Sequence, residues 1–191
     1  MVIAFNKPYG VLSQFTSDGS GNRPLSEFSL PKEVYPIGRL DSDSEGLLLL
    51  SDEIGLTDQL LNPKNQHPRR YISEVERVPE QFKLHQLETG IIIESRKTLP
   101  CKVTLIDKPE WLWERIPPVR FRKSVPTAWL QLELIEGKNR QVRKMTAHIG
   151  HPTLRLIRVK IGNFTIGDLA LGTWRKLTSK EIDQLFSKRM R

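Results

Sequence analysis

Hydrophobic and polar residues alternate with a period of two along much of the chain, which indicates β-strands. The clearest case is residues 129–135, where Leu130, Leu132 and Leu134 fall on one face and polar residues or Trp129 on the other. A continuous apolar run at 47–50 predicts a strand that is buried on both faces. Further strands are predicted at residues 2–5, 11–15, 71–78, 101–106 and 154–161.

A helical period replaces the alternation at residues 139–149, where Val142, Met145 and Ile149 recur at helix spacing before Gly150. Thr178 and Glu181 form a capping-box pattern that opens a last helix, ending at 188–191 in basic residues. Shorter helices are predicted at 56–61 and from 79–80 to 90. Many strands joined by turns or short helices predict an α+β fold with a mainly antiparallel, mixed sheet.

One weak boundary lies between residues 63 and 69. We expect a small N-terminal lobe at 1–63, which carries the polar loop before the apolar run, and a larger sheet lobe at 69–191.

The composition is that of a soluble globular protein, with 38% hydrophobic and 27% charged residues among 191. No run approaches the roughly 20 apolar residues that cross a bilayer. We also find no secretory signal at the start. A single cysteine, Cys101, excludes an intrachain disulfide and a cysteine-based zinc cluster. We therefore expect a cytoplasmic protein with no membrane partner.

The net charge of +8 is concentrated in one segment, residues 137–161, which has no acidic residue. Such a segment predicts a polyanionic partner, and nucleic acid is the simplest one. Its basic residues are Lys138, Arg140, Arg143, Lys144, Arg155, Arg158 and Lys160.

The polar loop at 38–46 delivers Asp41 to the start of the apolar run. A loop carried on a rigid element is a common place for chemistry. From spacing alone Asp41 is more often a turn residue, and a glycosidase-like pairing with Asp43 or Glu45 is an alternative.

His148-Ile149-Gly150-His151 spells a signature of class I aminoacyl-tRNA synthetases. That signature belongs at a strand-to-helix turn, whereas here it ends a predicted helix, and the chain has no phosphate-binding glycine loop. We interpret it as coincidence. The two histidines lack a third ligand at a supporting spacing, so we expect no metal.

Four ordered segments resemble the RsuA-like pseudouridine synthases, and the likeness covers essentially the whole chain. Gly38-Arg39-Leu40-Asp41 with Ser44 and Gly46 resembles the catalytic loop, and Asn6-Lys7-Pro8-Tyr9-Gly10 the opening segment. Residues 136–145 resemble the basic signature helix, and residues 154–162 the strand after it. The segment at 111–124 is most similar to a branch that acts on the large ribosomal subunit. That branch lacks a separate S4-type module, and from this resemblance we expect no separate S4 domain here and a start at the catalytic core.

The resemblance implies a pseudouridine-synthase fold with a catalytic cleft, and isomerisation of uridine to pseudouridine in 23S ribosomal RNA. The family's essential aspartate falls on Asp41, its active-site tyrosine on Tyr71 and the arginine that pairs with the aspartate on Arg143. Arg39 and Leu156 are assigned to the substrate pocket. An isomerisation changes no redox state and transfers no group, so we expect no cofactor.

The remaining basic residues are expected to hold RNA phosphates, which gives salt-sensitive affinity with little sequence information. They are Lys138, Arg140, Lys144, Arg155, Arg158 and Lys160. We expect the protein to act as a monomer.

Two departures and two alternatives qualify the resemblance. Arg69 stands where the family has lysine before the tyrosine, and Ser44 replaces threonine. A non-catalytic RNA-binding protein that retains the fold is one alternative, and another carboxylate enzyme acting on glycosidic bonds is the second.

Overall fold

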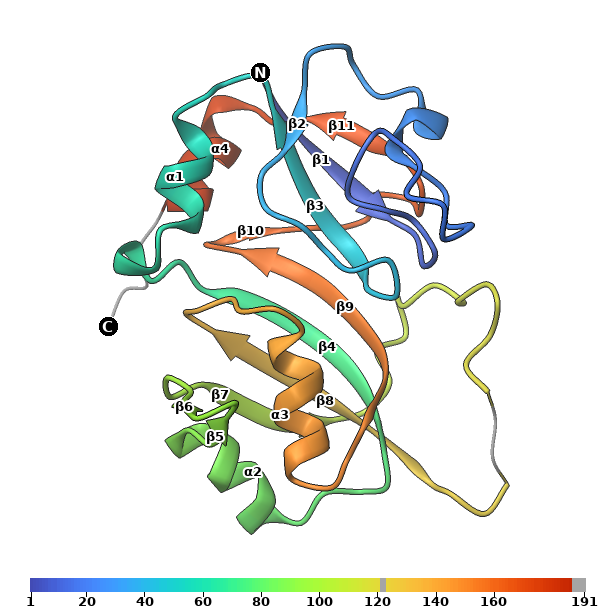
Figure 1. Ribbon diagram of the computed structural model, residues 1–191, viewed down its shortest axis with the longest axis vertical. Helices are drawn as coiled ribbons and strands as arrows, with labels where there is room; N and C mark the ends of the chain where they lie inside the picture. The colour runs from blue at the N-terminus through green and yellow to red at the C-terminus, as the bar shows by residue number, and fades with distance from the viewer. Residues whose placement is uncertain (121–122, 187–191) are drawn as a thin grey trace. The chain divides into compact units, whose positions relative to one another are not determined.

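The computed structural model describes residues 1–120 and 123–186 and divides into two compact units (Figure 1). Unit 1 comprises Met1–His67 and Ile157–Arg191, and unit 2 comprises Pro68–Leu156. Each unit has its own strands, helices and hydrophobic core, so each is described by itself.

Unit 1 is built around two long antiparallel strands, β1 (Val2–Lys7) and β3 (Glu45–Ser51), in which every residue is buried. The second part of β9 (Thr153–Ile161) runs parallel to β3. Three short antiparallel strands extend these pairs: β11 (Trp174–Lys176) on β1, β2 (Tyr35–Pro36) on β3 and β10 (Phe164–Thr165) on β9.

Short helices and a compact apolar cluster complete unit 1. The helices are α1 (Leu56–Leu61), α4 (Ser179–Phe186) and the 3₁₀ turns η1 (Leu25–Phe28) and η2 (Pro63–Asn65). The cluster joins both central strands to the loops between them, because it contains Ile3, Phe5, Val11, Leu25, Val34, Leu40, Leu48 and Leu50.

Unit 2 contains an antiparallel sheet with β8 (Thr127–Leu134) between β4 (Arg69–Glu76) and β7 (Lys102–Ile106). A separate small hairpin is formed by β5 (Ile92–Ile93) and β6 (Arg96–Lys97). The eight residues of β4 pair in register with the eight of β8, which fixes the face that each side chain occupies.

Helices α2 (Gln81–Thr89) and α3 (Gln141–His148) share one apolar cluster with the sheet of unit 2. The cluster takes Leu130, Leu132 and Leu134 from β8 and Val142 and Met145 from α3. Both helices lie over the same side of the sheet in Figure 1, which agrees with this shared core.

Most predicted elements are confirmed, since the strand faces at 129–135 and the apolar stripe of the helix at 139–149 are buried as expected. The capping box is also present, because Thr178 N–H donates to Glu181 and Glu181 N–H donates to the Thr178 hydroxyl. The predicted basic end of this helix at 188–191 lies outside the described residues.

The predicted strand at 11–15 is wrong, because this segment forms only one isolated bridge, Val11 to Arg23. Gly10 adopts a left-handed conformation with φ of 73°, and residues 10–13 then bond to other loops of unit 1 instead of forming a ladder.

The predicted domain limits need correction at the C-terminal side. The first boundary, at His67–Pro68, lies within the predicted interval, but Ile157–Arg191 belongs to unit 1 instead of the second lobe. The reason is strand pairing: β9 pairs with β3, and β11 pairs with β1, so the chain returns to its own N-terminal part.

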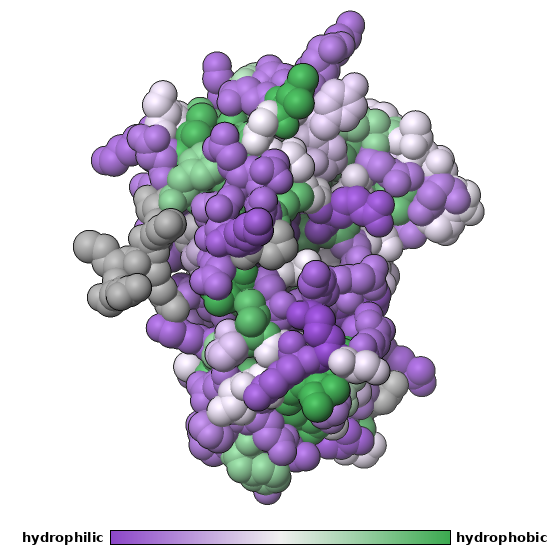
Figure 2. Space-filling model, turned by 60° about the vertical axis from the view of Figure 1, so that its left-hand side comes forward, coloured by the Kyte–Doolittle hydropathy of each residue, from purple (hydrophilic) through white to green (hydrophobic). Residues whose placement is uncertain are grey.

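The surface in Figure 2 is mainly hydrophilic, with hydrophobic side chains in small separate groups. Within the described residues no helix combines the length and the apolar character that a membrane span needs.

Candidate active site and RNA-binding segment

Asp41 begins a tight turn directly before β3. The N–H of Ser44 donates to the Asp41 carbonyl at 3.0 Å, and Ser44 and Glu45, which follow, are buried. The side chain of Asp41 is half-buried, whereas that of Arg39 is exposed. The loop thus places the Asp41 carboxylate just before a fully buried strand of unit 1, and Asp41 is a turn residue whose position also suits chemistry.

Lys7 is the most unusual charged residue near this turn, because it is fully buried at the end of β1. Its ammonium group donates to the carbonyls of Val11 at 2.6 Å and Pro8 at 3.1 Å. Burial lowers the pKa of Lys7 to about 7, although the charges of Glu45, Asp43 and Asp41 act to raise it. Lys7 and the acidic turn therefore influence one another electrostatically within unit 1.

Gly46 of β3 lies between two buried basic residues on the neighbouring strands. Lys7 is its partner on β1 and Arg158 its partner on β9. Gly46 has a φ of 96°, and a Cβ there would lie 2.3 Å from the carbonyl oxygen of Arg158. Glycine is required at this position because the strands approach too closely for any side chain. Buried Arg158 donates from Nε to the Leu47 carbonyl at 2.8 Å.

Tyr71 and Leu156 lie in unit 2, in one apolar neighbourhood. Tyr71 is half-buried on β4 opposite Leu132 of β8 and packs against the core cluster to which Leu156 belongs. The structure thus places both residues at the same hydrophobic core of unit 2.

Arg143 projects from α3, also in unit 2. Its Nη1 donates to the Thr153 carbonyl at 3.4 Å, and the hydroxyl of Thr153 contacts those of Thr146 at 2.8 Å and Ser73 at 3.3 Å. These contacts connect α3 to β9 and β4, so the guanidinium group is carried on a well-fixed helix. Of the five residues assigned to catalysis and the pocket, Asp41 and Arg39 belong to unit 1, and the other three belong to unit 2.

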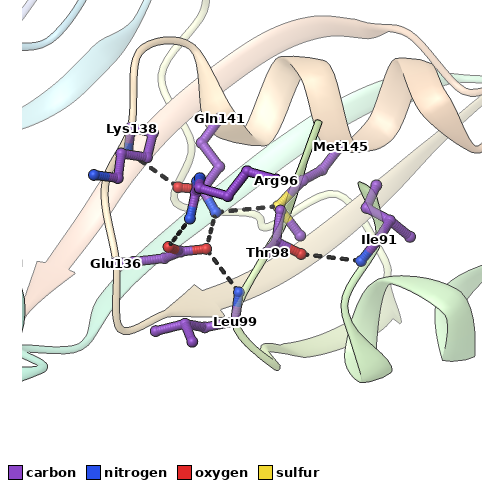
Figure 3. A network of polar contacts seen from close by, with 8 residues as sticks. All are labelled: Ile91, Arg96, Thr98, Leu99, Glu136, Lys138, Gln141 and Met145. Atoms are coloured by element: carbon purple, nitrogen blue, oxygen red, sulfur yellow. Dashed lines mark hydrogen bonds and ion pairs between the residues drawn. The ribbon is translucent and has the colours of Figure 1, made fainter. Parts of the chain in front are cut away.

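The turn that leads into α3 is held by a buried polar network (Figure 3). Glu136 accepts hydrogen bonds from Arg96 at 2.8 Å, from the Leu99 N–H at 2.8 Å and from Gln141 at 2.6 Å. Gln141 in turn accepts one from the Lys138 N–H at 3.0 Å. Burial acts to raise the pKa of Glu136, but these hydrogen bonds outweigh it and hold the pKa below its usual value.

The network leaves Lys138 and Arg140 exposed at the start of α3. Arg140 adopts a left-handed conformation with φ of 51° and lies between Lys138 and Gln141, which are joined by two hydrogen bonds of 3.0 and 3.1 Å. Lys144 is half-buried and forms an ion pair of 2.7 Å with Glu94 of the β5–β6 turn. The exposed pair is therefore better placed than Lys144 to meet phosphates.

Two members of the predicted phosphate-binding set are buried. Arg155 is 3% exposed and donates to the Trp113 carbonyl at 2.9 Å, and Arg158 is 5% exposed. Bonds to backbone carbonyls in the interior favour a structural role for both arginines over the predicted phosphate contact. Lys160, half-buried on β9, stays a candidate.

The synthetase-like histidine motif has a structural explanation. His148 ends α3, and buried His151 lies after it with Nδ1 3.0 Å from the Glu76 carbonyl of β4. This is not a strand-to-helix turn. In the described ranges no three or more His, Cys, Asp or Glu side chains gather as a metal-binding group.

The sequence analysis missed three buried polar residues that shape the candidate site, namely Lys7, Glu136 and Gln141. Lys7 follows an apolar strand and precedes Pro8, a position that could have marked it as buried. Glu136 and Gln141 lie within the recognised motif, but the bonds of Glu136 to Arg96 and Leu99, which are distant in the sequence, became visible only in the structure.

Comparison with known proteins places these features in one family. A family model described as RNA pseudouridylate synthase matches residues 1–148. The chain is 50% identical to ribosomal large subunit pseudouridine synthase E of Vibrio parahaemolyticus, over 92% of this chain and 73% of that protein. It is 48% identical to the Xanthomonas campestris protein of the same name, over 92% of this chain and 94% of the relative.

The fold gives the same answer. A crystal structure titled as a pseudouridylate synthase matches with a TM-score of 0.80 and 25% identity, covering 96% of this chain and 73% of that one. The fold and motifs define an RNA-modifying isomerase. The chain belongs to the RNA pseudouridylate synthase family, which converts uridine to pseudouridine.

Proposed function

We propose that this protein isomerises a specific uridine of 23S ribosomal RNA, with Asp41 as the essential carboxylate. The substrate assignment is supported by identity near 50% to proteins named large subunit pseudouridine synthases. The observation that carries the catalytic assignment is the position of Asp41, half-buried in a hydrogen-bonded turn on a fully buried strand.

The reaction breaks the bond between N1 of uracil and C1′ of the ribose, turns the base and joins C5 to C1′. N1 gains a proton and C5 loses one, so the sum of atoms is unchanged. A carboxylate serves this chemistry by attacking C1′ or C6 or by removing a ribose proton. We assign that group to Asp41.

Tyr71 and Arg143 are proposed to assist. An aromatic face replaces the stacking that a flipped base loses, and the half-buried ring of Tyr71 has the required character. A guanidinium group keeps a carboxylate ionised and oriented, and Arg143 is held on α3 for such a function. Leu156 is proposed to line the pocket, and exposed Arg39 is proposed to contact the substrate.

Lys138 and Arg140 are proposed to bind phosphates, because they are exposed on a turn that the Glu136 network holds in place. Lys160 and Lys144 are proposed as secondary contacts. We further propose that the enzyme acts as a cytoplasmic monomer without metal or cofactor, since the reaction requires none.

Tritium release from RNA labelled at C5 of uridine tests the proposal. We expect release from 23S rRNA of a strain lacking this protein, and none from labelled 16S rRNA or free uridine. Release from 16S rRNA alone would contradict the large-subunit assignment. Binding without release from any RNA would favour a non-catalytic RNA-binding protein, and free uracil as product would indicate a hydrolase.

A further inference from the structure

Ser13 bonds to both backbone groups of the residue that precedes Asp41. Its Oγ donates to the Leu40 carbonyl at 2.7 Å and accepts from the Leu40 N–H at 3.0 Å. Ser13 and Leu40 are both buried, at 9% and 7% exposure, and the Leu40 side chain belongs to the core of unit 1. One hydroxyl group thus satisfies both backbone hydrogen-bonding groups of Leu40, as a neighbouring strand would.

The residue that follows Asp41 is tied to the same segment. Gly10 N–H donates to the Ser42 carbonyl at 2.8 Å, and the Asp41 carbonyl closes its own turn with Ser44. The segment 10–13 is therefore hydrogen-bonded to the residues on both sides of Asp41. The serine hydroxyl thus contacts both backbone groups of the residue immediately before the carboxylate.

We infer that Ser13 is a positioning residue, whose hydroxyl fixes the backbone at Leu40 and thereby the direction of the Asp41 carboxylate. The inference rests on the proposed function of Asp41. Without the hydroxyl, a buried N–H and a buried C=O both lose their partner, and the loop relaxes to reach other donors and acceptors. A displacement of about 1 Å at a reacting group costs on the order of 100-fold in rate.

Ser13→Ala tests the inference, and the chain offers a matched control. Ser51 is a buried residue that ends β3 at the opposite end from the Asp41 turn, and its hydroxyl likewise donates one bond and accepts one, to the Met1 carbonyl at 3.0 Å and from the Glu53 N–H at 3.0 Å. Ser13→Ala and Ser51→Ala should therefore lose similar stability. Only the first should lower kcat, by about 10- to 100-fold, with KM nearly unchanged.

Tritium release from labelled 23S rRNA and thermal unfolding are measured for the parent, both alanine variants and Asp41→Asn. If kcat of folded Ser13→Ala equals that of the parent, or if Ser51→Ala loses as much kcat, the inference is overturned. Should Ser13→Ala fail to fold, Ser13→Cys, which fills the site with a somewhat larger and weakly hydrogen-bonding thiol, gives the same decision. Ser13→Thr retains the hydroxyl and is expected to recover most of kcat.

Failure of the proposed function has a different signature. A parent protein that releases no tritium contradicts the enzyme assignment, and an active Asp41→Asn contradicts the carboxylate assignment. Loss of activity in Asp41→Asn together with full kcat in Ser13→Ala overturns the positioning role alone.

Discussion

The ammonium group of Lys7 donates a hydrogen bond of 2.6 Å to the carbonyl oxygen of Val11, and both residues are fully buried. A charged group inside an apolar core is tolerated only with strong partners. This bond connects β1 to the segment 10–13 that holds the Asp41 loop. Lys7 thus supports the candidate site from within unit 1 and makes the stability of the unit depend on pH.

Lys7→Met is expected to change that dependence. Burial lowers the pKa of Lys7 from 10.5 to about 7, so between these values the unfolded chain binds a proton that the folded chain has released. Stability from this group therefore rises with pH over that interval, by about 1.4 kcal/mol per pH unit. Urea unfolding between pH 7 and 9 should show this rise in the parent and its loss in the variant. Equal slopes would contradict the lowered pKa.

Asp41→Asn should abolish isomerisation and leave RNA affinity nearly unchanged, because the amide retains the shape and lacks the charge. Asp43→Asn is the control, since it removes an acid from the same turn and should remain active. Tritium release measures the isomerisation activity, and filter binding measures the RNA affinity. Activity in Asp41→Asn, or equal loss in both variants, would contradict the assignment.

Lys138→Ala should weaken RNA binding and flatten its salt dependence. One phosphate contact contributes about 0.7 to 0.9 to the slope of log K against log salt. Lys102→Ala removes an exposed lysine from β7 in the same unit, and its slope should match the parent. RNA affinities measured over a salt series give these slopes. An unchanged slope for Lys138→Ala would exclude this residue from the phosphate-binding set.

Gly46→Ala should destabilise the protein by roughly 2 to 5 kcal/mol, because the new Cβ meets the Arg158 carbonyl at 2.3 Å and a φ of 96° is unfavourable for alanine. Gly21→Ala separates the two causes. Its φ is 79°, but no atom lies within 4 Å of the added Cβ, so about 1 to 2 kcal/mol is expected. Chemical denaturation measures the stability loss of both variants. Similar losses would contradict the prediction, because they would mean that the close contact at Gly46 adds no cost.

Glu136→Gln should lower stability at neutral pH by about 1.5 to 3 kcal/mol, because the charged acceptor of the Figure 3 network is lost. The pKa of Glu136 is below its usual value in the folded state, so its contribution is present above pH 4.5 and is lost as pH falls through the lowered pKa. Parent and variant should therefore converge in acid. A gap that persists at low pH would contradict the charge-based explanation.

Local pattern was enough to predict most elements, whereas the candidate residues came from the resemblance of ordered motifs to a family. The alternation in β8 and the helical stripe of α3 specify their buried faces, because both features depend on neighbours within one element. The motif around Asp41 could be recognised for the same reason, since its residues are contiguous. The strand predicted at 11–15 failed where the left-handed Gly10 redirects the chain to bonds with distant loops.

Long-range pairing decided the rest. Residues 157–191 return to unit 1 because β9 and β11 find partners there, and no local feature of the sequence records that choice. Burial of Lys7 and Arg158 has the same origin, as each lies on a strand flanking Gly46, where the close approach of three strands excludes water. The sequence by itself determined that Asp41 lies in a polar loop before a buried strand. Only the tertiary structure decided what holds that loop, because hydrogen bonds between segments far apart in the chain depend on the folded register.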